Sequence, residues 1–124
     1  MRPLAAALLL LVALAGPALA VPREGRAYIT NYCVHCGGRQ MADGTRPRIG
    51  CCAADRSLPF GTRVWIEGRG TFTVHDRGGA VHGKHFDLWV AGRCPGGCWR
   101  GAITKRGVRY RIISMPKKRG RGQR

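Results

Sequence analysis

Acidic residues are scarce in this chain: six Asp and Glu stand against 22 Lys and Arg. Beyond residue 20, no segment has the 3.6-residue hydrophobic periodicity of an amphipathic helix. The chain contains no internal repeat, and its glycines match neither a P-loop nor a dinucleotide-binding pattern. These absences argue against helical bundles, solenoids and the common nucleotide-binding folds.

A single long apolar run, "LAAALLLLVALAG", follows Met1-Arg2 and precedes the small-residue site Ala18-Leu19-Ala20. This pattern predicts a secretory signal over residues 1–20. A transmembrane anchor is the alternative, but the run is shorter than the roughly 20 residues that span a bilayer. No cysteine follows it directly, which argues against a lipid anchor. We therefore expect a secreted, periplasmic or cell-wall-associated protein with one domain over residues 21–115.

Residues 21–124 keep 21 basic and six acidic side chains, a formal net charge of +15. Such a charge predicts attraction to polyanions. Outside the cytoplasm these are anionic wall polymers or membrane surfaces, and we expect no nucleic acid partner. A soluble basic surface without a specific partner remains the alternative. The tail over residues 116–124 is charged and broken by glycine, and is expected to be disordered. We expect a monomer.

All six cysteines follow the predicted signal: Cys33, Cys36, Cys51, Cys52, Cys94 and Cys98. An even number in a short exported chain predicts disulfides, although six cysteines allow 15 pairings. The alternative is a zinc site, because Cys33-x-x-Cys36 and Cys94-x-x-x-Cys98 have suitable ligand spacing. The compartment favours disulfides. Strain argues against a bond between Cys51 and Cys52, so these two are expected to reach different partners.

Six short pieces rich in β-branched and aromatic residues lie between glycine-rich turns: residues 27–33, 50–55, 62–68, 71–76, 85–90 and 108–115. They predict an all-β fold, a small barrel or sandwich. Glu67–Thr71 is expected to form the hairpin turn between the third and fourth strands. Alternation within the third strand turns Val64 and Ile66 inward.

Alternation in the strand over residues 85–90 turns its apolar residues, such as Phe86, toward the core. His85, Asp87 and Trp89 share the opposite face. An acid beside an indole suits a sugar-handling groove, where the ring packs on the pyranose and the acid acts on the glycosidic oxygen. The alternative is that Trp89 fills a second side of a barrel.

Three linked motifs surround three aspartates in the central and C-terminal part of the chain. They are Asp55 with Pro59-Phe60-Gly61-Thr62, Asp76 with Gly78-Gly79-Ala80-Val81 and Gly83, and Phe86-Asp87-Leu88-Trp89. In this order and spacing they closely resemble the three-aspartate (3D) domain of stationary-phase survival proteins and membrane-bound lytic transglycosylase A. The resemblance covers roughly residues 27–115.

The resemblance implies a six-stranded double-psi β-barrel that acts on peptidoglycan glycan strands. Family members cleave the MurNAc–GlcNAc bond as lytic transglycosylases and leave a 1,6-anhydro end. By position, Asp87 matches the acid/base of the family, and Asp76 and Asp55 match its two supporting carboxylates. The remaining residues expected to bind substrate are Trp89, Gly78, Gly79 and His85. We expect no cofactor, and no metal in the site.

One acid is sufficient for this chemistry, because the 6-hydroxyl of the sugar itself attacks. The acid first donates a proton to the leaving oxygen and then acts as a base. Nearby carboxylates raise its pKa, whereas nearby arginines lower it. Arg77 and Arg56 depart from the family pattern and each place a cation beside an aspartate, which could turn that aspartate into a plain ion pair.

Three alternatives to an enzyme with this site remain. A non-catalytic wall-binding module of the expansin or barwin type shares a related barrel but lacks the Asp-x-Gly-Gly-Ala pattern. A cationic effector acting by charge alone would leave the aspartates without a role. Finally, His75, His82 and His85 could hold a metal with Asp76 or Asp87, although histidines in a turn-rich segment are more often solvated or hydrogen-bonded.

Overall fold

The structure is a computed structural model that describes residues 20–95 and 105–117. The predicted signal over residues 1–20 and the predicted tail over residues 116–124 lie almost wholly outside the described residues. In the part that is described, no helix is both long and apolar enough to cross a membrane.

Six strands form in the six predicted places. They are β1 (Glu24–Tyr32), β2 (Cys51–Ala53), β3 (Arg63–Ile66), β4 (Gly70–Asp76), β5 (His85–Trp89) and β6 (Lys105–Ser114). A single helical turn, α1 (Val34–Gly37), follows β1. The all-β prediction is therefore confirmed.

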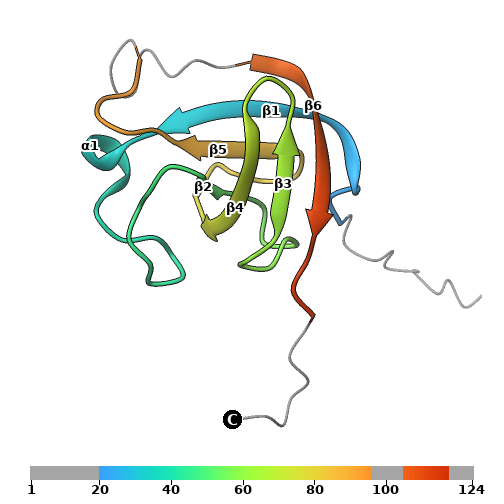
Figure 1. The fold of residues 1–124 in the computed structure, drawn as a ribbon, viewed down its shortest axis with the longest axis horizontal. Coiled ribbons are helices and arrows are strands. Elements are labelled where there is room, and N and C mark those ends of the chain that lie inside the picture. Colours follow the sequence, from blue (N-terminus) through green and yellow to red (C-terminus); the bar gives the residue numbers. More distant parts are fainter. Residues whose placement is uncertain (1–19, 96–104, 118–124) are drawn as a thin grey trace, which may run out of the picture.

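The strands close into a barrel in the order β1-β5-β2-β4-β3-β6 (Figure 1). Two neighbouring pairs, β1 with β5 and β2 with β4, run parallel, and the others run antiparallel. Closure gives every strand a partner on both sides, so the sheet has no open edge. The structure thus selects the barrel over the sandwich. The double-psi connection stays a prediction.

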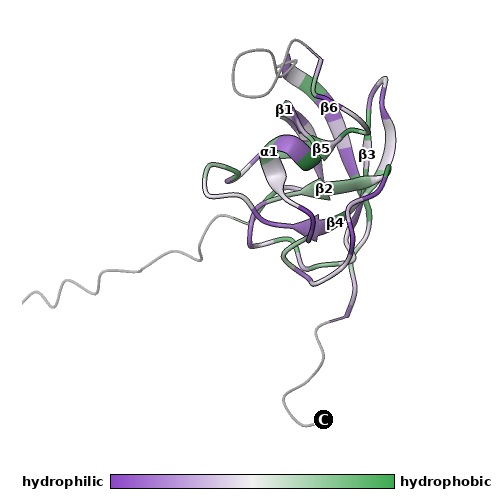
Figure 2. Cartoon of the chain, turned by 90° about the vertical axis from the view of Figure 1, so that its left-hand side faces the viewer, coloured by the Kyte–Doolittle hydropathy of each residue, from purple (hydrophilic) through white to green (hydrophobic). Residues whose placement is uncertain are grey.

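Alternation along the strands divides core from surface. Val64, Ile66 and Phe86 are fully buried and Leu88 is nearly so, which confirms the faces expected for β3 and β5. Hydrophilic and hydrophobic residues also alternate along β6 (Figure 2). A second, smaller apolar cluster includes residues of β1, the loop before β2, β2 and the segment after β4: Tyr32, Met41, Cys51, Ala53 and Val81.

The predicted hairpin between β3 and β4 is present. Ile66 pairs with Gly70, and Gly68 and Gly70 have φ values of 72° and 94°. Side chains disfavour this left-handed region of φ and ψ, so glycine suits both positions. The short glycine-containing turn sets the register that buries Val64 and Ile66.

The disulfide prediction is not confirmed. No disulfide joins any two of the five described cysteines, and Cys98 lies outside the described residues. Cys51 and Cys52 are both buried in β2, where Cys51 belongs to the smaller cluster and Cys52 to the main core. Because adjacent strand residues face opposite sides, these two thiols lie in different environments.

Candidate functional site

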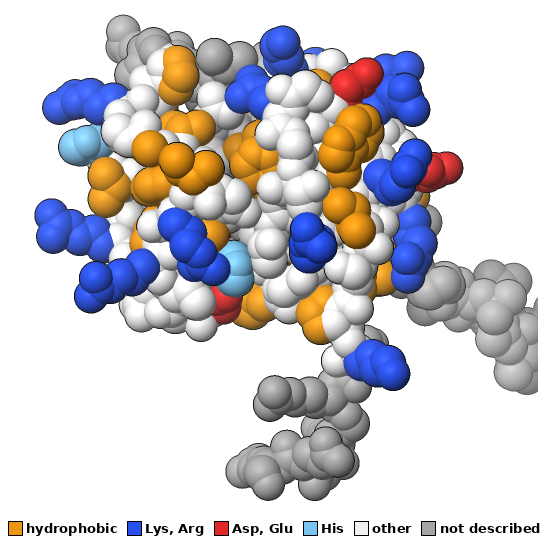
Figure 3. Space-filling model, in the orientation of Figure 1, with side chains coloured by type: hydrophobic (Ala, Val, Ile, Leu, Met, Phe, Trp, Pro, Cys, Tyr) orange, Lys and Arg blue, Asp and Glu red, His pale blue; other side chains and the backbone are white. Residues whose placement is uncertain are grey.

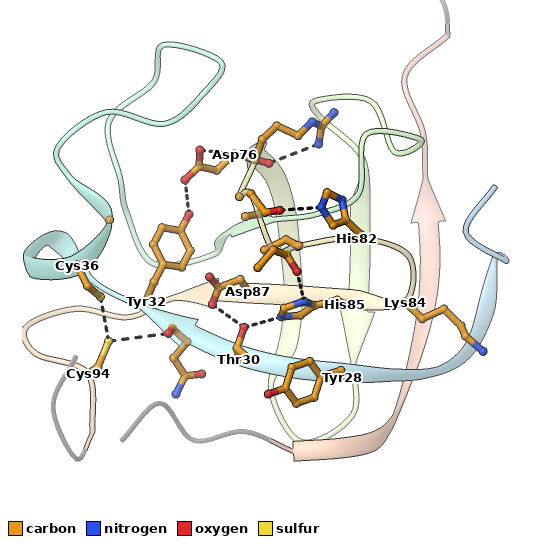
Figure 4. Close-up of a pocket in the computed structure, with 18 of the residues that line it drawn as sticks. Tyr28, Thr30, Tyr32, Cys36, Asp76, His82, Lys84, His85, Asp87 and Cys94 are labelled. Carbon is orange, nitrogen blue, oxygen red and sulfur yellow. Dashed lines mark hydrogen bonds between the residues drawn. The ribbon is translucent and has the colours of Figure 1, made fainter. Parts of the chain in front are cut away.

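A cavity of about 840 Å³ opens beside the paired strands β1 and β5. Its wall includes Tyr28, Thr30 and Tyr32 from β1, His85 and Asp87 from β5, and Asp76 at the end of β4 (Figure 4). The parallel register sets Thr30 directly opposite Asp87. Side chains from distant parts of the chain therefore meet in one pocket.

Asp87 is a half-buried carboxyl in the wall of this pocket. The hydroxyl of Thr30 donates a hydrogen bond of 2.8 Å to its Oδ1 atom. Burial raises the pKa of Asp87 to about 6, and the negative charge of Asp76 contributes in the same direction, while the hydrogen bond from Thr30 opposes the change. Near neutral pH this carboxyl is therefore able both to give and to accept a proton.

A short chain of hydrogen bonds extends from Asp87. Thr30 Oγ1 lies 2.8 Å from His85 Nε2, and His85 Nδ1 lies 3.2 Å from the carbonyl oxygen of Ala80. Burial lowers the pKa of His85, which favours the neutral ring. Thr30 has one hydroxyl proton, which it donates to Asp87 when that carboxyl is ionised. When Asp87 carries a proton the direction reverses: Asp87 donates to Thr30, Thr30 donates to Nε2, and Nδ1–H donates to Ala80. A protonated Asp87 and a neutral His85 thus satisfy every contact in the chain.

Asp76 is held by three donors. The hydroxyl of Tyr32 donates to its Oδ2 atom at 2.8 Å, and the backbone N–H groups of Ala42 and Arg77 both donate to Oδ1 at 2.9 Å. Burial and the adjacent Asp76 carboxylate raise the pKa of Tyr32 well above its usual range, so Tyr32 remains a donor. Asp76 is therefore an immobilised acceptor whose charge acts on Asp87.

Asp55 has a different position. Its carboxylate accepts hydrogen bonds from the backbone N–H groups of Ser57, at 2.8 Å, and Gly83, at 2.6 Å. Although burial acts to raise it, these bonds bring the pKa of Asp55 below its ordinary value. Asp55 does not line the cavity, whereas Asp76 and Asp87 do. It ties the segment after β2 to the loop that precedes β5.

Arg77 lines the cavity but does not form an ion pair with a neighbouring aspartate. Its guanidinium donates to the carbonyl oxygen of Leu58 at 2.6 Å and lies 4.2 Å from the ring centroid of Phe60. Within the described residues the ion pairs are between other side chains, and Arg56 is exposed. The departures from the family pattern thus leave the carboxylates of the pocket without a direct cationic partner.

Trp89 lies on the same face of β5 as Asp87, as alternation predicts, but it does not line the cavity. Its ring packs against the smaller apolar cluster, and its Nε1 atom is buried without a hydrogen-bond partner among the described residues. The aromatic rings in the cavity wall are those of Tyr28 and Tyr32. The alternation of residues in β1 predicts that Tyr28 and Tyr32 share one face. No local sequence pattern predicts that β1 pairs with β5, so the position of these two rings in the cavity could not be predicted.

The other residues expected to bind substrate do line the cavity: Gly78, Gly79 and His85. At Gly78 an added Cβ atom would lie 2.8 Å from the side chain of Val81, so the loop can pack in this form only with glycine. The loop after β4 therefore forms a close-fitting wall opposite β1 and β5.

The histidines do not gather into a metal site. His75 bonds to Asp43, His82 lies 2.7 Å from the carbonyl oxygen of Gly79, and His85 belongs to the chain that leads to Asp87. In the described ranges, these histidines form no group with metal-ligand spacing.

Comparison with known protein families identifies one domain in this chain. Residues 50–105 match the family model of the 3D domain. This range runs from the residue before β2 to the first residue of β6 and contains Asp55, Asp76 and Asp87. No curated protein and no solved structure matches the chain.

Proposed function

We propose that this chain, which carries a 3D domain over residues 50–105, is an exported lytic transglycosylase that cleaves the MurNAc–GlcNAc bond of peptidoglycan. The main support is Asp87, a carboxyl with a pKa of about 6 in the wall of a cavity of about 840 Å³. Such a cavity has the size of a typical ligand site. The relation of the 3D domain to lytic transglycosylase catalytic domains supports peptidoglycan as the substrate class.

In the proposed reaction, protonated Asp87 donates its proton to the glycosidic oxygen as the bond to C1 of MurNAc breaks. The resulting carboxylate then accepts the proton of the MurNAc 6-hydroxyl, whose oxygen bonds to C1 and closes the 1,6-anhydro ring. Asp87 ends the cycle protonated. No water is consumed.

The state of Asp76 supports this single-acid route over hydrolysis. An inverting hydrolase needs a second carboxylate to activate water, and a retaining hydrolase needs one to attack the sugar. The oxygens of Asp76 already accept three hydrogen bonds. Its proposed role is electrostatic, because its charge favours the protonated form of Asp87. Asp55, which braces the loops of the pocket, has a supporting role.

Substrate contacts are proposed for the ring of Tyr28, which lines the cavity, and for the backbone around Gly78 and Gly79. A sugar ring packs well on an aromatic side chain. Lys84 and Arg106 also line the cavity and can attract the carboxylates of peptidoglycan.

The test is release of anhydro-muropeptides from purified sacculi, measured by mass spectrometry. We expect Asp87→Asn to lower the rate by at least ~10²-fold because it removes the proton donor while preserving shape. Glu67→Gln, which changes an exposed acid in the hairpin turn, is the matched control and should keep the wild-type rate.

Binding to sacculi, measured by co-sedimentation, should persist in the Asp87→Asn protein. Wild-type release by that variant would refute the catalytic assignment. If the wild-type protein binds sacculi but releases no anhydro-muropeptides, the wall-binding module is the correct function.

A further inference from the structure

Three cysteine sulfurs gather at one end of the pocket, where Cys36 and Cys94 form part of its wall. Cys33 immediately precedes the helical turn α1. Cys36 lies within this turn, and Cys94 follows β5 (Figure 4). The Sγ atoms of Cys33 and Cys36 are 3.7 Å apart, those of Cys36 and Cys94 are 3.6 Å apart, and all three lie within 4.8 Å of one another. This cluster has no part in the proposed reaction.

The separations match ligands around one metal ion. A disulfide requires a sulfur–sulfur distance of about 2.05 Å. Four sulfurs at about 2.3 Å from a tetrahedral zinc ion are separated by about 3.8 Å, which is the edge length of that tetrahedron. The two closest pairs in the cluster lie near the second value.

The backbone around Cys33 and Cys36 is arranged to hold this geometry. The N–H of Cys33 lies 3.2 Å from the Sγ atom of Cys36 and donates to it, which stabilises a thiolate. The N–H of Gly37 donates to the carbonyl oxygen of Cys33 at 2.8 Å and closes the turn. An added Cβ atom at Gly37 would lie 2.4 Å from the ring of Tyr32, so glycine is required for the turn to pack there.

The burial of the cluster is that of a structural site. Cys33 is 0% exposed and Cys94 is 3% exposed, while Cys36 is half-buried. Sulfur-rich tetrahedral sites that exclude solvent are the usual structural zinc sites. A disulfide between any two of these cysteines would leave the third thiol in contact with the disulfide sulfurs, without a bonding partner of its own within the cluster.

We propose that Cys33, Cys36 and Cys94 are three ligands of a structural zinc ion. The site replaces the disulfides expected from the compartment and is independent of the proposed enzymatic activity. Cys98 lies outside the described residues, and the proposal does not assign the fourth ligand. The ion would join the end of β1 to the segment after β5, next to Tyr32, which donates to Asp76.

The first test measures metal and thiols in the full chain isolated under reducing conditions with zinc present. We expect about one zinc ion per chain by mass spectrometry of the elements. Cys36→Ser and Cys94→Ser should each lower the zinc content at least tenfold. Cys52→Ala is the matched control, because it removes a buried thiol from the main core; its zinc content should be unchanged.

The second test uses the wild-type chain, so that it does not depend on how the variants fold. Cobalt(II) added to the metal-free, reduced chain should produce the visible absorption of tetrahedral cobalt thiolate, saturate at one equivalent, and be displaced by zinc. Zinc should also raise the thermal midpoint. The proposal is overturned if the folded, reduced chain gives no such absorption, or if peptide mapping finds a disulfide among these three cysteines in chains isolated with zinc.

Discussion

At the scale of single residues, the position of Asp87 explains its chemistry. It lies inside β5, which holds its carboxyl more firmly than a loop would, and its main-chain neighbour across the sheet is Thr30. Burial in the barrel wall and the adjacent Asp76 both disfavour its ionised form. These effects suit Asp87 to proton transfer. They also mean that ionised Asp87 destabilises the folded state.

The pH dependence of stability should reveal this cost. The pKa of Asp87 rises from 3.8 to about 6 on folding, so the folded state binds the proton more tightly and its stability falls as the pH rises through that interval. Above about pH 6 the full cost is about 3 kcal/mol before solvent screening, and we expect about 1–2 kcal/mol in practice.

Asp87→Asn should therefore be more stable than wild type at pH 7.5 and close to wild type at pH 4, as measured by urea unfolding at both pH values. Equal differences in unfolding free energy at the two values would contradict the raised pKa. Glu67→Gln again provides the control for removal of one negative charge.

The two neighbours of Asp87 should shift the pH profile of activity in opposite directions. Asp76→Asn removes a charge that raises the pKa of Asp87, so the high-pH limb of kcat/KM should move to lower pH. Thr30→Val removes a donor that lowers this pKa, so the limb should move to higher pH. The profiles are measured with sacculi between about pH 4 and 8; shifts in the same direction would contradict the assignment of Asp87.

At the scale of elements, local patterns in the sequence predicted the six strands, the β3–β4 hairpin and the buried faces of β3 and β5. These features depend on residues close together in the chain, such as the alternation around Val64 and Phe86. The parallel pairing of β1 with β5 joins segments about 57 residues apart, and no local pattern specifies its register. For this reason Thr30 and Tyr28 were not predicted as pocket residues.

Trp89 shows the same limit. Alternation predicted its face correctly. However, two side chains on the same face of a strand can contact different parts of the protein. Asp87 opens to the cavity, and Trp89 meets the smaller apolar cluster that includes Met41 and Val81. The residues that form this cluster come from β1, the loop before β2, β2 itself and the loop after β4, and only the folded structure brings them together.

The hairpin offers a prediction at the same scale. Gly70 begins β4 with a φ of 94°, a conformation that costs other residues about 1–2 kcal/mol. Gly70→Ala should lower the unfolding free energy by about that amount. Gly79→Ala, at a position where an added Cβ atom meets nothing within 4 Å and φ is not positive, should change it by less than about 0.5 kcal/mol. Thermal and urea unfolding of both variants provide the measurement, and equal losses would contradict the argument.

At the scale of the whole molecule, positive charge is distributed widely. Lys and Arg side chains surround the face in Figure 3, and few acidic side chains appear there. The formal net charge of the sequence is +16. A distributed charge of one sign favours association with polyanions without selecting a particular one. Selection among glycans must therefore come from the pocket.

Binding to sacculi should accordingly weaken with salt. We expect affinity to fall at least about tenfold between about 50 and 300 mM NaCl, because screening shortens the range of these charges. Co-sedimentation at a series of salt concentrations measures this. A salt-independent affinity would mean that contacts in the pocket, not the charge of the molecule, dominate binding.

The closure of the barrel by β6 also determines when the chain can fold. β6 is the last strand among the described residues, and it pairs with both β1 and β3. In a nascent chain that ends before residue 105, β1 and β3 each lack a partner on one side. The sheet of such a chain therefore has two exposed edges. Pairings between the two ends of a chain form slowly because the loop they close is long. The barrel therefore closes only after β6 has been synthesised.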